Sequence, residues 1–340
     1  MVTKRGSGHR IAGKTFVFLA IVLSLLSPAP TWATELPAKQ ILDSVVKLDA
    51  EIPRSTRTAA HLGTKREGHA VVIDSEGLAL TIGYLILEAT AVRLTGADGR
   101  PVPASIVAYD HNTGFGLLRA LRPLGVKPIR LGDSSRAVAN TPVLVAGHGG
   151  AMNAVPVRVV SRRDFAGYWE YLLEKAIFTS PPFPGFGGAA LIDDRGQLIG
   201  IGSLVVGDAA AKDTYSPGNM FIPINALKPI MGDLISEGRS TGPHHPWIGV
   251  YTEEARGRLF VNRLAKEGPA RAAGIREGDI IVSVNDQPVA GQMDFYRKLW
   301  TRGGPDVTVE ITVLTEKSGL ATYSVAATDR YKWLQFSRGN

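Results

Sequence analysis

Short β-type runs separated by turn residues fill most of the chain, and this pattern restricts the folds open to it. Ala97-Asp98-Gly99 separates two of these runs. Asp-Gly favours the positive-φ turns that join twisted antiparallel strands, so residues 91–109 are predicted to form a hairpin. Residues 191–199 carry a second hairpin signal, and a strand is expected at 155–161. Many short strands at this spacing indicate a barrel or sandwich, not alternating βαβ units.

A turn-rich segment near residue 243 marks a change in the pattern. Residues 225–237 are predicted to form a helix that stops at Gly238, and Ser, Gly, Pro and His residues follow it. Beyond this segment a short helix is predicted between Pro269 and Gly274. The predicted organisation is a signal peptide (1–33), a first domain (34–242), a linker (243–246) and a second domain (247–330).

The second predicted domain continues with further strands and a helix. A strand is predicted at 280–284, a second helix at 293–301, and another strand at 307–313. On that second helix, Phe295 and Leu299 are four residues apart and therefore share a face.

The first residues have the pattern of an export signal. Four basic residues accompany an apolar run at 15–26, and Thr31-Trp32-Ala33 is similar to a small-x-small cleavage site. The alternative is an uncleaved membrane anchor, but the run is shorter than the roughly 20 residues that span a bilayer. We therefore expect an exported, periplasmic protein. Loss of this segment lowers the net charge from +7 to +3.

Composition argues against several classes of function. There is no basic stripe with interleaved aromatic residues, so nucleic-acid binding is not expected. The absence of cysteine removes disulfides and thiolate metal ligands. His244 and His245 are adjacent in a proline-flanked segment without a carboxylate cluster, so no metal and no cofactor are predicted.

The order of these segments resembles the HtrA/Deg family of trypsin-like serine proteases. The segment Trp247-Ile248-Gly249-Val250, the run at 268–289 and the helix near Phe295 are similar to a PDZ domain, and residues 219–225 are similar to the family's barrel. The resemblance implies a mainly β fold: a trypsin-like double β-barrel followed by a PDZ domain, a small β-barrel with two helices.

The resemblance also implies three catalytic positions, and none of them holds the family's residue. The histidine position holds Tyr84, the aspartate position holds Gly114, and the serine position holds Gly187. A serine needs a neighbouring base with a pKa near neutrality, which tyrosine does not provide. A residual oxyanion loop is expected at Gly185 and Gly187, because backbone N–H groups need no side chain.

A relocated triad is the alternative to a lost one. It would require a base and a nucleophile to meet within hydrogen-bond reach elsewhere in the fold. The remaining candidates are His69, His111 and His148 with Ser161, Ser180 or Ser203.

The PDZ-like segment is the strongest remaining candidate for a binding site. A PDZ domain adds a peptide strand to a sheet edge, and backbone N–H groups in a loop capture the terminal carboxylate. This assigns peptide binding to a loop and a helix face: Trp247, Ile248, Gly249, Val250, Phe295 and Leu299. The alternative for Phe295 and Leu299 is that both pack inward as core.

Three functions stay open from the sequence. The first is a non-catalytic HtrA-like protein of the cell envelope that binds C-termini or unfolded polypeptide, as a regulator, adaptor or holdase. The second is an active serine endopeptidase with a rearranged site, in envelope protein quality control. The third is a structural subunit, in a homo-oligomer or in a hetero-oligomer with an active paralogue.

Overall fold

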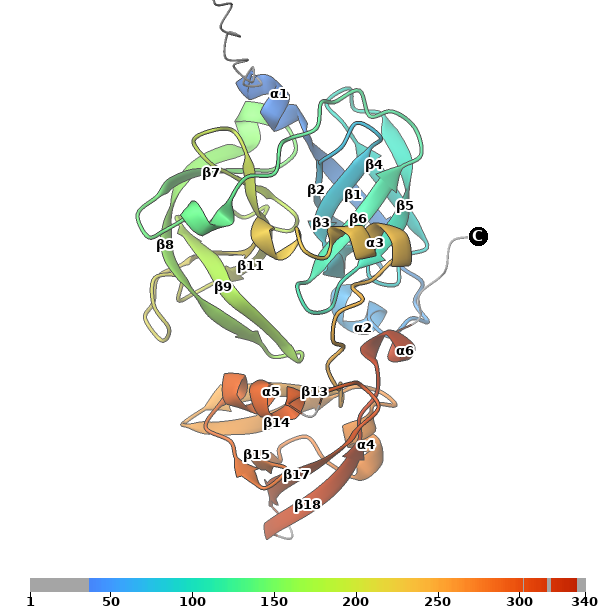
Figure 1. Cartoon of the computed structure of the whole chain (residues 1–340), viewed down its shortest axis with the longest axis vertical. Coiled ribbons are helices and arrows are strands. Elements are labelled where there is room, and N and C mark those ends of the chain that lie inside the picture. Colours follow the sequence, from blue (N-terminus) through green and yellow to red (C-terminus); the bar gives the residue numbers. More distant parts are fainter. Residues whose placement is uncertain (1–36, 302, 317–318, 335–340) are drawn as a thin grey trace, which may run out of the picture. The chain divides into compact units, whose positions relative to one another are not determined.

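Six antiparallel strands close into a first barrel (Figure 1). The structure is a computed structural model that describes residues 37–301, 303–316 and 319–334. The strand order around this barrel is β1-β2-β3-β6-β5-β4. Its strands are β1 (Val45–Glu51), β2 (Lys65–Val72), β3 (Leu78–Ile82), β4 (Ala91–Thr95), β5 (Pro101–Tyr109) and β6 (Phe115–Ala120). The short helices α1 (Ala38–Asp43), α2 (Ala59–Leu62) and η1 (Gly83–Leu85) flank these strands in the chain.

A second closed barrel follows with the order β10-β11-β12-β9-β8-β7. Its longest strands, β8 and β9, lie side by side as an antiparallel hairpin (Figure 1). The buried apolar side chains of the two barrels belong largely to one continuous core. The strands of the second barrel are β7 (Pro142–Ala146), β8 (Ala154–Gly167), β9 (Tyr171–Ser180), β10 (Ala190–Ile192), β11 (Leu198–Val206) and β12 (Gly218–Pro223). Short 3-10 turns η2 (Ser134–Arg136), η3 (Gly150–Asn153) and η4 (Ile224–Ala226) and helix α3 (Met231–Glu237) complete this part.

The C-terminal part has its own sheet, in the order β13-β14-β15-β17-β18, and its own apolar core. Strand β13 lies at the edge of that sheet, so one side of its backbone is free of sheet partners. The elements are β13 (Val250–Ala255), β14 (Arg258–Leu264), α4 (Pro269–Ala273), β15 (Ile280–Val284), β16 (Gln287–Pro288), α5 (Gln292–Trp300), β17 (Thr308–Thr315), β18 (Gly319–Ala326) and α6 (Arg330–Trp333). The predicted mainly β fold class is confirmed.

Several local predictions are confirmed. Strands β4 and β5 pair as the hairpin expected from Asp98-Gly99, and β10 and β11 pair around Gly196. Helix α4 begins at Pro269 and ends before Gly274, which has a φ of +106°. The glycine conformation there is the left-handed one that usually ends a helix.

Two local predictions need correction. The helix expected over residues 225–237 is a 3-10 turn, η4, followed by α3, which starts only at Met231. Pro229 accounts for this, because proline lacks an N–H and disfavours helical backbone in the residue before it. The strand expected at 155–161 extends to Gly167, and its partner β9 was not predicted. The predicted signal peptide (1–33) lies outside the described residues, and no described helix has the length and apolar character needed to cross a membrane.

Candidate functional site

The three positions that the resemblance assigns to a triad lie next to one another. Tyr84 belongs to η1, Gly114 precedes β6, and Gly187 lies in the loop between β9 and β10. The Tyr84 hydroxyl lies 3.1 Å from the place that a Cβ on Gly187 would take. The N–H of Gly83 donates to the carbonyl of Gly114 at 2.7 Å. The first barrel therefore supplies two of these positions and the second barrel supplies the third.

Tyr84 is held as a neutral hydrogen-bond donor. Its hydroxyl donates to the carbonyl oxygen of Ser203 at 2.9 Å. Burial raises the pKa of the Tyr84 phenol well above its ordinary value. A phenol with a raised pKa does not ionise near neutral pH, so it offers no base for a nearby hydroxyl.

At Gly114 the backbone conformation favours glycine. Its φ is +83°, a conformation that residues with a side chain rarely adopt. A Cβ there would lie 3.4 Å from the hydroxyl of Tyr171. That hydroxyl donates to the carbonyl of Thr113 at 2.7 Å and is therefore fixed in place.

The glycine loop at 185–188 packs closely against β2. The N–H of His69 donates to the carbonyl of Gly187 at 2.9 Å. At Gly188, φ is +77° and a Cβ would lie only 1.9 Å from the carbonyl oxygen of His69. Among the hydrogen bonds of residues 37–301, none starts at the N–H of Gly185 or of Gly187. The expected oxyanion loop stays a prediction.

The histidines of the relocated-triad alternative have other environments. His69 Nδ1 accepts a hydrogen bond from the N–H of His148 at 3.1 Å, and burial lowers the pKa of His69 to about 4. His111 lies edge-on between the rings of Tyr109 and Tyr331, and burial lowers its pKa well below the usual value.

Two of the serines of that alternative, Ser161 and Ser180, also have other partners. Ser161 Oγ donates to the carbonyl of Ala209 at 2.6 Å, and Ser180 Oγ donates to the carbonyl of Pro217 at 3.0 Å. Within the part of the chain that the structure describes, no hydrogen bond joins a serine hydroxyl to a histidine ring.

A large cavity lies beside these positions. Its volume is about 710 Å³, which falls within the range of ordinary ligand pockets. Tyr84 and Gly114 line it together with aromatic side chains such as Tyr171, Phe186 and Trp333. The space is large enough for several peptide side chains, although no hydrogen-bonded serine–histidine pair lines it among the described residues.

The loop before β13 holds a carboxylate. The N–H of Ile248 donates to one oxygen of the Glu170 side chain at 3.1 Å, and those of Gly249 and Val250 donate to the other at 2.6 and 2.7 Å. Gly249 has a φ of +79°, which permits three successive N–H groups to face one ligand. The sequence predicted this loop but not Glu170.

Burial is the main influence on Glu170. It raises the pKa of this carboxyl to about 7, and the three backbone donors oppose that rise. Arg330 is a nearby cation that also opposes it. The carboxylate therefore depends on the loop for its stabilisation, because a buried charge without partners is costly.

The other predicted binding residues lie around this loop. Trp247 is buried and pairs through its backbone with Thr328. Phe295 and Leu299 are fully buried in the core of the C-terminal part, the second of the two alternatives weighed for them. Their role in peptide binding stays a prediction.

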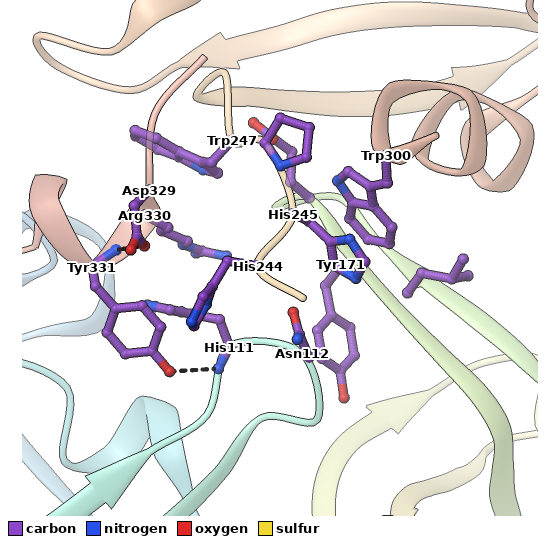
Figure 2. A pocket seen from close by; sticks show the side chains of 13 residues that line it. His111, Asn112, Tyr171, His244, His245, Trp247, Trp300, Asp329, Arg330 and Tyr331 are labelled. Carbon is purple, nitrogen blue, oxygen red and sulfur yellow. Dashed lines mark hydrogen bonds between the residues drawn. The ribbon is translucent and has the colours of Figure 1, made fainter. Parts of the chain in front are cut away.

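His244 and His245 line a small cavity of about 50 Å³ next to Glu170 (Figure 2). The ring of His245 stacks on Trp300, with ring centres 4.3 Å apart. Among the described residues, no group of three His, Asp or Glu side chains is arranged to hold a metal ion.

Two domain models match the chain. Residues 68–201 match the trypsin-like peptidase domain, and residues 246–322 match the PDZ domain. The protein therefore combines a trypsin-like fold with a C-terminal PDZ domain. That combination and order are those of the HtrA/Deg proteins, and the chain is HtrA-like.

Individual relatives support the same relationship. The chain is 27% identical over 320 residues to serine protease PepD of Mycobacterium tuberculosis, covering 87% of this chain and 66% of PepD. It is 26% identical over 236 residues to periplasmic serine endoprotease DegP of Escherichia coli, covering 66% of this chain and 49% of DegP. The chain thus spans about half to two thirds of the length of these relatives.

Solved structures share the fold. The HtrA-type protease AlgWS227A with decapeptide superposes with a TM-score of 0.51 at 19% identity, covering 87% of this chain and 98% of that one. At this identity the likeness concerns the fold alone.

Proposed function

We propose that this chain is a non-catalytic HtrA-like protein that binds polypeptide C-termini or unfolded segments through its PDZ domain. The observation that carries the proposal is the loop at Ile248, Gly249 and Val250, whose three N–H groups converge on one carboxylate. A peptide's terminal carboxylate has the same chemistry, and β13, at the edge of its sheet, has the backbone groups for strand addition.

The proposed loss of catalysis rests on the environment of the triad positions. Tyr84 is a partly buried neutral phenol, and Gly114 and Gly187 have no side chain to act as orienting acid or nucleophile. The relatives are named as serine proteases, so activity in this chain is the competing proposal. The name of the periplasmic relative also supports the proposed location in the cell envelope.

The binding half of the proposal is tested on an array of decapeptides that vary at the last three positions. Each sequence is presented once with a free C-terminal carboxylate and once as the amide. We expect the mature protein to bind a subset of the free peptides and none of their amides. Equal binding to both forms, or to neither, contradicts C-terminal recognition.

The catalytic half is tested by incubating the purified protein with casein. We expect no cleavage above that of a mock preparation. Cleavage that a serine-reactive phosphonate abolishes supports the alternative, an active endopeptidase with a rearranged site. Co-purification of an HtrA-type protease from the envelope would instead support the proposal of a subunit that assembles with an active paralogue.

A further inference from the structure

The hairpin between β8 and β9 lies against the PDZ peptide site. Its tip consists of residues 168–170, and the flanking Gly167 and Tyr171 pair with each other. Beside the tip, Ala166 and Leu172 pack against the apolar core of the PDZ domain. The hairpin is therefore part of the second barrel in sequence but covers a surface of the PDZ domain.

Two contacts of the tip match the two elements of C-terminal peptide recognition. The first is the Glu170 carboxylate in the loop at Ile248, Gly249 and Val250. The second is a backbone bond, in which the N–H of Thr252 on the edge strand β13 donates to the carbonyl of Tyr168 at 2.9 Å. Both the carboxylate capture and the strand-edge pairing that a bound peptide would make are thus present within the chain.

The order of these contacts is that of an antiparallel pair. Tyr168 contacts Thr252, and Glu170, two positions later in the tip, contacts Val250, two positions earlier on the receiving strand. A peptide that pairs antiparallel with β13 would bring its terminal carboxylate to the same loop.

Tyr296 on helix α5 fastens the tip from the other side. Its hydroxyl donates to the carbonyl of Gly167 at 2.7 Å and accepts the N–H of Glu170 at 3.2 Å. The hydroxyl of Thr252 lies 3.1 Å from the same oxygen. The tip is thus held between the edge strand and α5.

Glu170 adopts a backbone conformation that is uncommon for its residue type. Its φ is +55°, a position in a hairpin turn where glycine or asparagine is more usual. A side chain kept in such a conformation points to a role for that side chain. Here the carboxylate provides one, because it satisfies three buried N–H groups.

We propose that Glu170 and the backbone of Tyr168 act as an internal substitute for a peptide C-terminus, so that the PDZ site is self-occupied and a peptide must displace the hairpin tip to bind. The inference rests on the proposed function, since it regulates the same peptide site. A binding partner therefore carries a free carboxylate and competes with a side chain of the chain itself.

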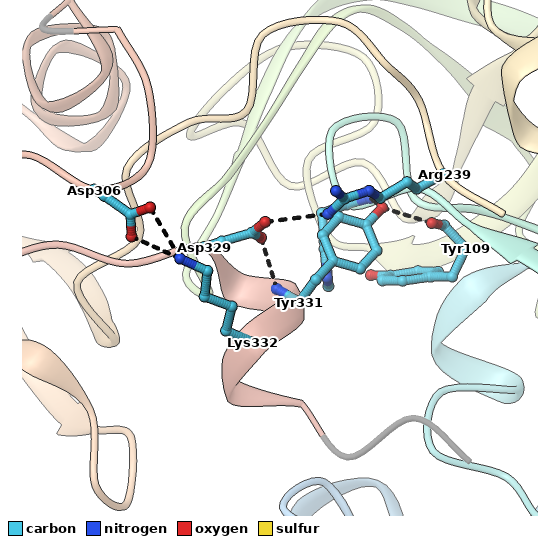
Figure 3. Close-up of polar contacts among 7 residues, drawn as sticks. Tyr109, Arg239, Asp306, Asp329, Tyr331 and Lys332 are labelled. Atoms are coloured by element: carbon cyan, nitrogen blue, oxygen red, sulfur yellow. Dashed lines mark hydrogen bonds and ion pairs between the residues drawn. The ribbon is translucent and has the colours of Figure 1, made fainter. Parts of the chain in front are cut away.

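Contacts away from Glu170 also join the segment around α6 to the rest of the chain. The Tyr331 hydroxyl donates to the carbonyl of Tyr109 at 2.6 Å, and Arg239 pairs with Asp329 at 3.2 Å (Figure 3). These contacts involve neither the hairpin nor the carboxylate loop, so a variant at Glu170 removes the internal ligand selectively.

The test compares Glu170→Ala with Glu174→Ala in the full mature protein. Glu174 lies on the same hairpin but is exposed and makes none of these contacts. The probe is the strongest free-carboxylate decapeptide from the array, labelled with fluorescein and titrated by anisotropy. We expect the Kd of Glu170→Ala to fall about tenfold or more, the factor for a loop about nine-tenths self-occupied, and Glu174→Ala to match the wild type.

Hydrogen exchange supplies a readout that does not depend on peptide binding. We expect the amides of Ile248, Gly249 and Val250 to exchange slowly in the wild type and in Glu174→Ala, and much faster in Glu170→Ala. In the wild type, addition of peptide should accelerate exchange at the N–H of Glu170.

The outcomes separate the two proposals. Peptide binding with the same Kd in all three proteins, together with unchanged exchange at the loop, overturns self-occupancy and leaves C-terminal recognition standing. Faster loop exchange in Glu170→Ala without binding of any free-carboxylate decapeptide supports self-occupancy and overturns the proposed function. Glu170→Gln, which keeps the size of the side chain, repeats the comparison if the alanine variant does not fold.

Discussion

Two glycine-containing loops of this protein differ in what faces them. In the barrel, the loop at 185–188 lies beside Tyr84 and the ring of His69, and no serine hydroxyl of the described residues is hydrogen-bonded to that ring. In the PDZ domain, the loop at 247–250 is filled by the Glu170 carboxylate. Backbone N–H groups can remain in a fold after the catalytic side chains are gone, so their presence alone identifies no ligand. A loop whose N–H groups bind a carboxylate shows which ligand it accepts. The comparison therefore favours the PDZ loop as the working site.

The largest effect should come from the barrel loop. Gly188→Ala would place a Cβ 1.9 Å from the carbonyl of His69 at a φ of +77°. We expect a loss of more than about 4 kcal/mol in the free energy of unfolding, because backbone must move in a packed site.

The matched control is Gly185→Ala in the same loop. Its Cβ would lie 3.2 Å from side-chain atoms of His69 and Phe183, which can adjust. Urea unfolding of both variants measures the difference. Equal stability of the two variants would show that the loop is not held as described.

The next effect concerns the PDZ loop. Glu170→Ala removes the acceptor for three buried N–H groups, so we expect the free energy of unfolding to fall by about 1–3 kcal/mol. Glu174→Ala should stay within about 0.5 kcal/mol of the wild type, as exposed positions usually do. Chemical denaturation measures the free energy of unfolding of both variants. A Glu170 variant as stable as the wild type would argue against the binding of the three N–H groups to Glu170.

A smaller loss is expected for Tyr296→Phe. The change removes the hydroxyl that holds Gly167 and Glu170 but keeps the ring that fills the PDZ core. We expect about 0.5–1.5 kcal/mol of destabilisation and a modest gain in peptide affinity. Combining it with Glu170→Ala in a double-mutant cycle should give non-additive effects, because both act on one contact. Strictly additive effects would show that Tyr296 does not act on the contact between the hairpin tip and the PDZ loop.

The smallest expected effect is the change of peptide affinity with pH. The pKa of Glu170 is raised from 4.5 to about 7 chiefly by burial, so docking of the tip takes up a proton. Docking is therefore strongest below pH 4.5 and weakens as the pH rises to 7, and the peptide carboxylate stays ionised above about pH 5.

We expect the wild-type affinity for a free-carboxylate peptide to improve about twofold between pH 7 and 8, the change given by this pKa difference. Arg330 and Tyr296 also face Glu170, and His244 and His245 line the adjoining cavity. The Glu170→Gln variant keeps all four of these groups but has no titrating carboxyl at position 170. Its affinity should therefore lack this twofold change. Identical pH profiles of the two proteins would remove Glu170 from the competition.

The sequence predicted the parts of the fold that carry local signals. The Asp98-Gly99 turn and the Pro269 and Gly274 helix ends have short-range physical causes, and the structure follows them. Strand β9 was missed because its own buried and exposed positions do not alternate, and because the turn carries Glu170 where glycine would have marked it. A signal was present in the aromatic residues that flank this turn, since such residues favour strands.

The candidate site likewise has a part that the sequence predicted and a part that it did not. The loop at 247–250 was recognised from its own residues, but its occupant is 78 to 80 residues away in the chain. Contacts of that kind depend on how two folded parts meet, which neither propensity nor periodicity describes. The buried positions of Phe295 and Leu299 likewise follow from packing around the whole helix and not from their spacing.

The most direct measurement of the central claim is the intact mass of the purified protein after treatment with a serine-reactive phosphonate. We expect no adduct, because Gly187 offers no hydroxyl and Tyr84 offers no base. A trypsin control in the same reaction verifies the reagent. A stoichiometric adduct on one serine, lost when a specific histidine is replaced, would contradict the account and establish a working nucleophile in this chain.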